Sequence, residues 1–217
     1  MSPSAVTDDA THPFGLDLRY DCESSALPAA LSQRFVRLEL GEEGHDYVER
    51  ALSSRPGRTK TTLHRVLRSW LSDFDVNGLL DMYPMHLLGT SQWRELLGAD
   101  LTRRHLDVGA GSGDITKTLA PLVGQTVTTE TSRIMARKLR KSGFRCIETD
   151  LAESEVPDPG YDVVTCLNVI DRCARPRSLL DKLTTALAPG GRLVLATPLP
   201  FDPFVYDGPS SLAPTER

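Results

Sequence analysis

The fold of this chain is decided by the stretch His105-Leu106-Asp107-Val108-Gly109-Ala110-Gly111-Ser112-Gly113-Asp114. Leu106 and Val108 are apolar, which predicts a buried parallel strand over 104–108. Three glycines follow at two-residue intervals, and apolar residues then recur at the spacing of a helix over 113–122. Glycine permits a positive φ and lets a ligand approach the backbone closely. The stretch therefore predicts a strand, a glycine turn and a helix start that form a nucleotide-type site.

The spacing of the glycines separates several kinds of nucleotide site. The dinucleotide fingerprint G-x-G-x-x-G needs its third glycine one residue later than Gly113, and no lysine follows in the P-loop position. The frame Asp107-Val108-Gly109-Ala110-Gly111-Ser112-Gly113 instead resembles motif I of class I S-adenosylmethionine (SAM) methyltransferases. On this stretch alone, a NAD site and an ordinary glycine turn stay open as alternatives.

Composition and charge narrow the class of protein. The 217 residues are typical of a soluble globular chain, and their formal net charge of −4 argues against a nucleic-acid partner, whose phosphates need a basic face. No apolar run reaches the roughly 18 residues of a membrane span. The first ten residues lack the basic and apolar regions of a secretory signal and the arginines of a transit peptide, so we expect a cytoplasmic protein.

The four cysteines show no pattern of a metal site. They form no C-x-x-C pair and have no paired histidines nearby, so buried thiols in a reducing compartment are expected, without zinc or disulfides.

Four segments are expected along the chain. Residues 1–26 are rich in Ser, Asp and Pro and are expected to form a disordered tail. A helical extension is expected over 27–100, a SAM-binding core over 101–206, and a loose tail over 207–217.

The extension is expected to hold three helices. One begins near Glu42, and a longer amphipathic helix runs from Thr61 to Phe74, with apolar residues three and four apart that should pack against the following domain. Asp75-Val76-Asn77-Gly78 is expected to form a turn, and Ser91 is expected to cap the third helix.

Strands and helices alternate from Arg104 onward, which predicts a parallel sheet with helical crossovers. The helix after Pro176 is expected to reach Leu187 and to stop at 188–191. The predicted fold is α/β: a Rossmann-like, mostly parallel, doubly wound sheet with an N-terminal helical extension. Its expected strands cover 104–108, 126–130, 145–147, 162–167 and 192–196, with helices over 113–122, after Thr131 or Ser132, and after Pro176.

Polar residues end four of these strands, where an open parallel sheet binds its ligand. Asp107 closes the first strand, and Glu130 closes the second, where an acidic side chain can accept both hydroxyls of a ribose. Asp150 follows the third strand, where a carboxylate can accept from an adenine amino group, and Asn168 and Asp171 follow the fourth. The set favours SAM, although Glu130 by itself fits NAD equally well.

A more specific resemblance comes from the segment Cys166-Leu167-Asn168-Val169-Ile170-Asp171-Arg172-Cys173. It is similar to the CLN-x-x-DRC segment of the DREV family, the methyltransferase-like protein 9 type. Leu199-Pro200-Phe201-Asp202-Pro203-Phe204-Val205 resembles that family's LPFHPYV segment, with Asp202 in place of His and Phe204 in place of Tyr. Asp75-Val76-Asn77-Gly78-Leu79 matches its DINGF stretch, and Arg34-Phe35-Val36 lies where the family has a Phe-Val pair. The resemblance covers about residues 20–206.

This resemblance implies a SAM-dependent protein-histidine methyltransferase. Such enzymes methylate the pros nitrogen of histidine in His-x-His segments with a small central residue, so the implied partner is a protein or peptide with that motif. Asn168 and Asp171 are the implied catalytic residues, and Asp171 would face the target imidazole. Pro200, Phe201 and Pro203 would wall the substrate groove. By position, SAM would be held by Asp107, Gly109, Ala110, Gly111, Glu130, Asp150, Leu151 and Asn168.

A carboxylate beside the target imidazole suits this chemistry. Neutral imidazole has one N–H and one lone-pair nitrogen, and it is mostly neutral at pH 7. If Asp171 accepts the tele N–H, the pros lone pair faces the methyl group, and the carboxylate stabilises the cation that forms. The alternative role for Asp171 is that of a helix N-cap. Arg172 is interpreted as an ion-pair or surface residue.

The chain departs from the family pattern at its C-terminal end. Class I methyltransferases usually add two strands after the fifth, and only about twenty residues follow here, so those strands are expected to be missing and 193–195 to form a sheet edge. In the family, that part also brings a tyrosine to the substrate site. Three alternatives stay open: a small-molecule methyltransferase, a non-catalytic SAM-fold binding module, and an RNA methyltransferase, which the net charge disfavours.

Overall fold

The computed structural model describes residues 23–53, 57–98, 104–207 and 210–216. The chain divides into two compact units, Met1–Leu38 and Glu39–Arg217. In the first unit a 3-10 turn, η1, covers Ser24–Ala26, and a short helix, α1, covers Ala29–Ser32. Most of the tail predicted over 1–26 lies outside the described residues.

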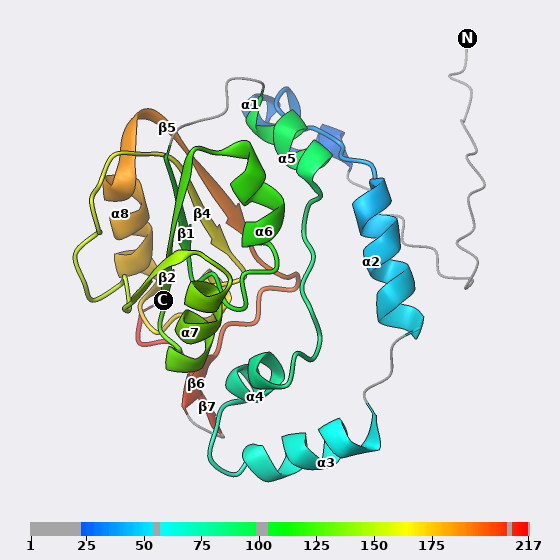
Figure 1. Cartoon of the computed structure of the whole chain (residues 1–217). Coiled ribbons are helices and arrows are strands. Elements are labelled where there is room, and N and C mark those ends of the chain that lie inside the picture. The colour runs from blue at the N-terminus through cyan, green and yellow to red at the C-terminus, as the bar shows by residue number, and fades with distance from the viewer. Residues whose placement is uncertain (1–22, 54–56, 99–103, 208–209, 217) are drawn as a thin grey trace. The chain divides into compact units, whose positions relative to one another are not determined.

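The second unit is built on a parallel sheet of five strands in the order β3-β2-β1-β4-β5 (Figure 1). The strand order reverses between β1 and β4, and ligands bind beyond the carboxyl ends of the strands at such a switch point. The predicted α/β, Rossmann-like class is confirmed. The strands are β1 Arg104–Val108, β2 Gln125–Glu130, β3 Arg145–Glu148, β4 Tyr161–Leu167 and β5 Leu187–Ala196.

Helices cover both faces of this sheet, as a doubly wound fold requires (Figure 1). On one face the leucines of α8 (Pro176–Ala186) pack against apolar residues of β1, β2 and β4. On the other face lie α5 (Thr90–Leu97), α6 (Thr116–Leu119) and α7 (Arg133–Lys141). The remaining helical elements are α2 Glu42–Ser53, α3 Arg58–Leu67, α4 Asp73–Leu79, η2 Ala120–Leu122 and η3 Ile170–Arg172.

A buried polar network joins β1 to β4 beneath α6. Thr116 and Thr165 donate their hydroxyls to the two carboxylate oxygens of Asp107, at 2.6 and 2.7 Å. The Nε2 atom of His105 lies 2.8 Å from Oγ1 of Thr165, and its Nδ1 atom lies 3.3 Å from Oγ1 of Thr126. The hydroxyl of Thr165 donates its hydrogen to Asp107, so the hydroxyl oxygen is left to accept from the Nε2–H of His105. The imidazole of His105 is therefore neutral, with its hydrogen on Nε2. Burial lowers the pKa of His105 to about 3.

The helical extension differs from the prediction between residues 61 and 79. The single long helix is replaced by α3 and α4, because Ser72 caps a new helix by accepting from the backbone N–H of Asp75 at 3.0 Å. The turn expected at 75–78 is therefore wrong. Gly78 lies inside α4, where a Cβ atom would come within 1.8 Å of the Met135 side chain. The missed signal is the Ser-x-x-Asp pattern of a helix start.

Smaller corrections concern where helices begin and end. α5 begins at Thr90 with Gly89 as its cap, whose N–H donates to Oε1 of Gln92 at 2.7 Å, so Ser91 does not cap it. The helix expected over 113–122 starts only at Thr116 and finishes as the 3-10 turn η2. α8 ends at Ala186, so Leu187 lies in β5 and not in the helix.

The loose tail expected over 207–217 is also wrong. β6 (Val205–Asp207) and β7 (Ser210–Leu212) form an antiparallel hairpin, and the carboxylate of Glu216 accepts from the backbone N–H of Ser178 at 2.9 Å. The hairpin forms its own two-stranded sheet. In the part of the chain that is described, β5 therefore stays at the edge of the main sheet, as predicted. None of the described helices is long and apolar enough to cross a membrane.

The buried imidazole makes the stability of the fold depend on pH. The unfolded chain binds a proton at His105 near its ordinary pKa of about 6.5, whereas the folded ring stays neutral down to about pH 3. The free energy of unfolding should therefore fall as the pH falls through this window, by up to about 1.4 kcal/mol per pH unit.

A variant isolates this contribution. Burial raises the pKa of Asp107 and of Glu130. These two carboxyl groups affect the free energy of unfolding in the opposite direction to His105, because the stability they contribute is lost as the pH rises through their folded pKa values. Urea unfolding of the wild type and of His105→Gln between about pH 5 and 8 should give a difference in stability that shrinks as the pH falls. Parallel pH profiles for the two proteins would show that His105 is not held neutral.

Candidate active site

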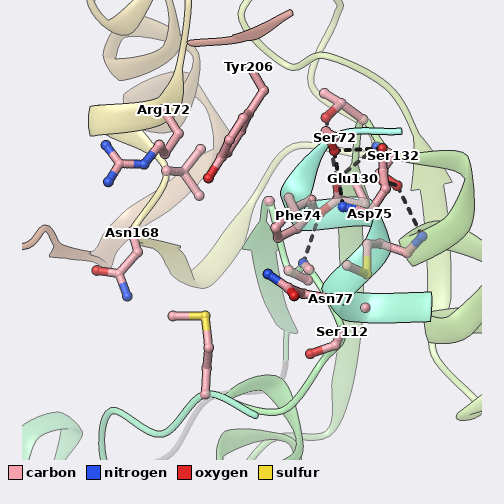
Figure 2. Close-up of a pocket in the computed structure, with 18 of the residues that line it drawn as sticks. Ser72, Phe74, Asp75, Asn77, Ser112, Glu130, Ser132, Asn168, Arg172 and Tyr206 are labelled. Atoms are coloured by element: carbon pink, nitrogen blue, oxygen red, sulfur yellow. Dashed lines mark hydrogen bonds between the residues drawn. The ribbon is translucent and has the colours of Figure 1, made fainter. Parts of the chain in front are cut away.

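A cavity of about 960 Å³ lies at the carboxyl ends of the central strands. Its walls are the glycine turn after β1, the ends of β2 and β4, the start of α7, the loop after β3, and α4 with the segment that follows it. Figure 2 shows lining side chains from these elements, with Glu130 and Ser132 on one side and Asn168 and Arg172 on the other. Its size is within the range of pockets that bind small molecules and cofactors.

Most of the predicted site residues lie at this cavity. Asp107 does not, because both of its carboxylate oxygens are buried against threonine hydroxyls between β1, β4 and α6. It fixes the ends of the strands and is not brought to the cavity. The predicted residues that do line the cavity are Gly109, Ala110, Gly111, Glu130, Asp150, Leu151, Asn168 and Asp171.

The glycine turn is held close to the end of β4. Gly109 and Gly111 have φ values of +67° and +59°, a left-handed conformation that favours glycine. The N–H groups of Gly109 and Ala110 both donate to the carbonyl of Thr129, at 2.9 and 3.1 Å. A Cβ atom on Gly109 would lie 2.6 Å from Cγ2 of Val169. The turn therefore leaves no room for a side chain where a ligand would meet the backbone.

Glu130 ties the glycine turn to the start of α7. Its buried carboxylate accepts from the backbone N–H of Gly111 through Oε2 and from that of Ser132 through Oε1, both at 2.8 Å. Burial raises the pKa of Glu130, and these backbone donors lower it. Oε1 also accepts from the hydroxyl of Thr131 at 3.4 Å, whereas Oε2 can accept a second hydrogen bond, so Glu130 retains the capacity to bind a ribose hydroxyl.

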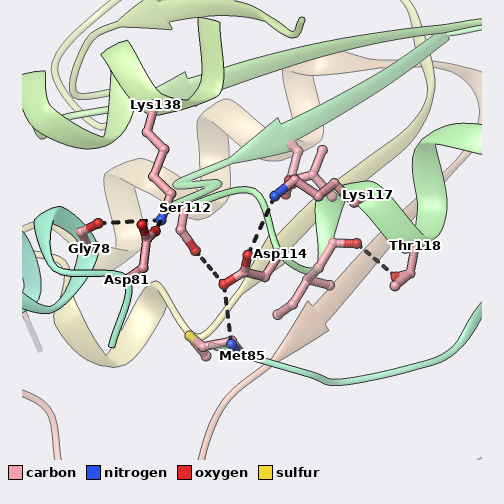
Figure 3. A network of polar contacts seen from close by, with 11 residues as sticks. Gly78, Asp81, Met85, Ser112, Asp114, Lys117, Thr118 and Lys138 are labelled. Carbon is pink, nitrogen blue, oxygen red and sulfur yellow. Dashed lines mark hydrogen bonds and ion pairs between the residues drawn. The ribbon is translucent and has the colours of Figure 1, made fainter. Parts of the chain in front are cut away.

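α4 forms a wall that the sequence reasoning did not assign to the site. Asp75 is hydrogen-bonded to Ser132 at the start of α7, and Lys138 of α7 contacts both Asp81 and the carbonyl of Gly78, the latter at 3.3 Å (Figures 2 and 3). The resemblance of 75–79 to the DINGF stretch was a signal that this segment belongs to the site. The segment was predicted to be a turn, so its position on a helix was missed. α4 is thus fastened over the glycine turn through α7.

The segment after α4 is fastened to the glycine turn as well (Figure 3). Oδ2 of Asp114 accepts from the hydroxyl of Ser112 at 2.6 Å and from the backbone N–H of Met85 at 3.3 Å. Lys117 lies 3.6 Å from the other oxygen of the same carboxylate. These contacts hold Met85, which lines the cavity together with Tyr83.

Asp171 has one carboxylate oxygen without a partner. Its side chain is only 3% exposed; Oδ2 lies 2.9 Å from Nη1 of Arg172, whereas Oδ1 is buried and has no hydrogen-bond partner within 23–53, 57–98, 104–207 and 210–216. A buried unpaired oxygen of this kind costs roughly 1–3 kcal/mol, so it marks a place where a ligand can donate a hydrogen bond. Asp171 lies within η3 and caps no helix, so the N-cap alternative is wrong.

Asn168 precedes this carboxylate in a left-handed conformation, with a φ of +57°. Its backbone N–H donates to the carbonyl of Ala196 at 2.8 Å, and its side chain lines the cavity, as Figure 2 shows. Asn168 and Asp171 therefore lie together at the cavity wall formed by the end of β4.

The proline-rich segment reaches the site in a different way from the one predicted. Pro200, Phe201 and Pro203 are not among the cavity-lining residues, and Phe201 is 50% exposed. Tyr206 of β6 lines the cavity instead, together with Pro198 and Val205 (Figure 2). No local pattern in the sequence marks Tyr206, because its position depends on the hairpin that carries it.

Phe204 couples this hairpin to Asp171. Its backbone N–H donates to the carbonyl of Asp171 at 3.0 Å, and its ring lies 3.8 Å below the guanidinium of Arg172. The Phe204 ring also meets the Tyr206 ring edge to face, with centroids 5.1 Å apart. Arg172 therefore holds both the catalytic candidate Asp171 and the segment that carries Tyr206.

Comparison with known families identifies the chain. The family model described as DREV methyltransferase matches residues 19–216. The chain belongs to the DREV methyltransferase family. The resemblance predicted from the motifs around Asn168 and Asp171 is thus confirmed at the level of the family.

Curated relatives of this DREV family member are more distant. The ubiquinone biosynthesis O-methyltransferase of Xanthomonas euvesicatoria pv. vesicatoria is 28% identical over 137 residues, which are 60% of this chain and 56% of that protein. The highly reducing polyketide synthase sthA of Phaeosphaeria nodorum is 32% identical over 160 residues, 62% of this chain and 6% of that protein. The chain therefore spans little more than half the length of the first of these relatives.

Solved structures with similar folds cover about half of the chain. The N-methyltransferase NodS of Bradyrhizobium japonicum, in complex with S-adenosyl-L-homocysteine (SAH), has a TM-score of 0.43 and 21% identity over 49% of this chain and 58% of that one. A Haloferax volcanii methyltransferase complex with its Trm112 activator gives a TM-score of 0.49 and 19% identity, over 57% of this chain and 59% of that one.

The cofactor of this DREV family member is SAM, and the cavity has residues that fit it. The glycine turn lines the cavity, and Oε2 of Glu130 can accept a further hydrogen bond from a ribose hydroxyl. Oδ1 of Asp150 accepts from the backbone N–H of Ala152 at 2.9 Å, and Oδ2 is unpaired among the described residues. We expect these residues, with Asn168 and Leu151, to hold SAM.

The glycine turn gives a direct test of the cofactor site. Gly109→Ala should weaken binding of SAH by at least about tenfold, because the new Cβ meets Val169 and occupies ligand space. Gly143→Ala is the matched control, since Gly143 also has a positive φ of +91° but no atom within 4 Å of its Cβ position. Calorimetry should give wild-type affinity for the control, and equal affinities for both variants would remove the turn from the site.

Proposed function

We propose that this chain is a protein-histidine methyltransferase that transfers a methyl group from SAM to the pros nitrogen of histidine in His-x-His segments. The observation that supports this proposal is Asp171, a residue of the same cavity wall as the glycine turn, whose Oδ1 atom is buried and unpaired among the described residues. Membership of the DREV family supports the methyl-transfer part of the proposal. The histidine substrate rests on the motif resemblance together with this oxygen.

The free oxygen matches what a histidine ring offers. Neutral imidazole has one N–H to donate and one lone pair to react. If the tele N–H donates to Oδ1 of Asp171, the ring is fixed in the tautomer whose lone pair is on the pros nitrogen. SAM supplies an electrophilic methyl group on a sulfonium. The negative charge of Asp171 then stabilises the positive charge that the ring acquires, and the imidazolium afterwards loses its N–H proton.

The neighbouring residues keep this carboxylate in one orientation. Arg172 pairs with Oδ2 at 2.9 Å and also donates to the carbonyl of Asp171 at 2.8 Å. Since Oδ2 is occupied, only Oδ1 is left for the ring. Tyr206, Pro198 and Val205 line the wall beside this position. We propose that they, in place of Pro200, Phe201 and Pro203, contact the peptide.

A small-molecule O-methyltransferase is the second candidate. The relatives named as ubiquinone biosynthesis O-methyltransferases support it. In that reaction Asp171 would accept the hydroxyl proton of a phenol rather than the N–H of a ring. Incubation with labelled SAM, a His-Ala-His peptide and a dihydroxybenzene should label the peptide. Label in the phenol alone would favour the second candidate, and SAM binding without any transfer would favour a binding module.

The role of Asp171 is tested by Asp171→Asn, which keeps the shape of the side chain and removes its charge. Loss of a charged hydrogen bond in a closed site should slow single-turnover methylation by about 30- to 1,000-fold, on the order of 2–4 kcal/mol. Affinity for SAH should stay unchanged, because this carboxylate is assigned to the substrate. Asp181→Asn, at an exposed position on α8, is the control and should behave as the wild type.

Two outcomes would contradict the assignment. Wild-type methylation by Asp171→Asn would end the catalytic role. A large loss of SAH affinity with intact folding would move Asp171 into the cofactor site.

A further inference from the structure

α3 carries an apolar stripe that the described part of the chain leaves exposed. Leu63, Val66 and Trp70 are spaced three and four residues apart, which places them on one side of the helix and of the turn that follows it. Their exposed fractions are 45%, 49% and 74%. The packing predicted against the following domain is therefore wrong for these three residues, whereas Leu67, Leu71 and Phe74 of the same predicted face are half-buried. The apolar area of the three exposed residues is available to a partner.

The opposite side of α3 is fastened to α4. Nε2 of His64 lies 3.0 Å from Oδ1 of Asn77, and Nε of Arg68 lies 3.2 Å from Oδ1 of Asp73. These contacts leave the apolar stripe on the outside. α3 is thus held in a fixed orientation relative to the helix that forms one wall of the cavity.

The stripe continues into the rim of the cavity. Trp70 is both exposed and a cavity-lining residue, and so are Tyr83 and Met85, with exposed fractions of 65% and 45%. A polypeptide substrate is longer than a cavity of about 960 Å³ that also holds SAM, so the chain on one side of the target histidine must leave over a rim. This rim offers exposed aromatic and sulfur-containing side chains, which are common anchors for peptides.

α3 is also uniformly basic. It contains Arg58, Lys60 and Arg65 at exposed positions and no acidic residue, although the chain as a whole has a net charge of −4. A basic surface beside an apolar stripe is complementary to a segment that mixes acidic and apolar side chains.

We propose that α3 is a docking surface for a segment of the protein substrate that adjoins the His-x-His motif and carries acidic and apolar residues. This proposal rests on the proposed histidine methyltransferase function. Apolar side chains of the segment contact Leu63, Val66 and Trp70, and its acidic side chains face Arg58, Lys60 and Arg65. The surface selects substrates by what lies beside the motif, which the cavity itself does not contact.

Basic amphipathic helices also bind anionic membranes, and that is the competing occupant. Continuity between the stripe and the cavity rim favours the protein substrate, because a membrane would not need Trp70 to lie at the cavity. The two occupants give different results in the experiments below.

The first experiment compares two peptides in steady-state methylation. One is a short His-Ala-His peptide, and the other extends the same motif by an acidic and apolar segment. The double variant Leu63→Ser with Val66→Ser, and the triple variant Arg58→Glu with Lys60→Glu and Arg65→Glu, should each raise KM for the extended peptide by about tenfold or more. The kcat for that peptide and all constants for the short peptide should stay unchanged.

Leu52→Ser is the matched control, because Leu52 is an exposed leucine on the neighbouring helix α2, with a 39% exposed fraction. It should leave both peptides unaffected. A KM for the extended peptide that is the same in the wild type and in both α3 variants would overturn the proposal.

The second experiment measures binding without catalysis. The chain has two tryptophans, and Trp93 is fully buried and donates to Thr118 at 3.0 Å, so a change in emission on docking reports on Trp70. The extended peptide with both histidines changed to alanine should shift this emission, and the double variant should weaken the response. Binding of this peptide without methylation of the histidine form would count against the proposed function and not against the surface.

An unchanged emission with the histidine-free peptide would overturn the proposal. If vesicles of phosphatidylcholine and phosphatidylserine shift the emission in that case, α3 is assigned to a membrane.

Discussion

The pairing of β1 with β4 is the constraint on which the site depends. Their parallel register sets Asp107 opposite Thr165, and the hydrogen bond between these two side chains joins the strands inside the core. Because both strands end at the same edge, the glycine turn after β1 and the Asn168–Arg172 segment after β4 lie side by side. The close approach of Gly109 to Val169 is the point of contact between them.

The pairing of β1 with β4 places the buried carboxylate of Asp171 where the fold satisfies only one of its two oxygens. Arg172 occupies one oxygen of Asp171, and Phe204 fixes the backbone of Asp171, but the second oxygen has no partner among the residues that the structure describes. Folded proteins satisfy most buried polar groups, and their exceptions concentrate where a ligand binds. Oδ1 of Asp171 is an unpaired acceptor on a carboxylate that Arg172 holds through Oδ2. A donor such as an imidazole N–H would satisfy it.

The parallel sheet could be predicted from the sequence because short strand-like runs, the clearest of them β4, alternate with segments of helical spacing. Glu130 and Asn168 were located correctly because a strand end fixes where the following residue lies. The same reasoning misplaced Asp107, since a side chain at the end of a strand can face either a ligand or a helix, and here the threonines of α6 and β4 bind it.

The parts that could not be predicted depend on contacts between residues far apart in the chain. α4 owes its place to Ser132 and Lys138 of α7, about sixty residues away. Tyr206 reaches the cavity through the hairpin that Phe204 and Arg172 hold. The exposed stripe of α3 shows the converse: its spacing predicts a buried face, but nothing in the sequence says which partner covers it.

The most direct test of the account is the position of the methyl group in the product. A His-Ala-His peptide, methylated by the wild-type protein with isotope-labelled SAM, should carry the label on the pros nitrogen of a histidine, as read by nuclear magnetic resonance of the imidazole carbons. If Oδ1 of Asp171 accepts the tele N–H, only the pros nitrogen keeps a lone pair to react. Label on the tele nitrogen, or on no histidine at all, would contradict the account.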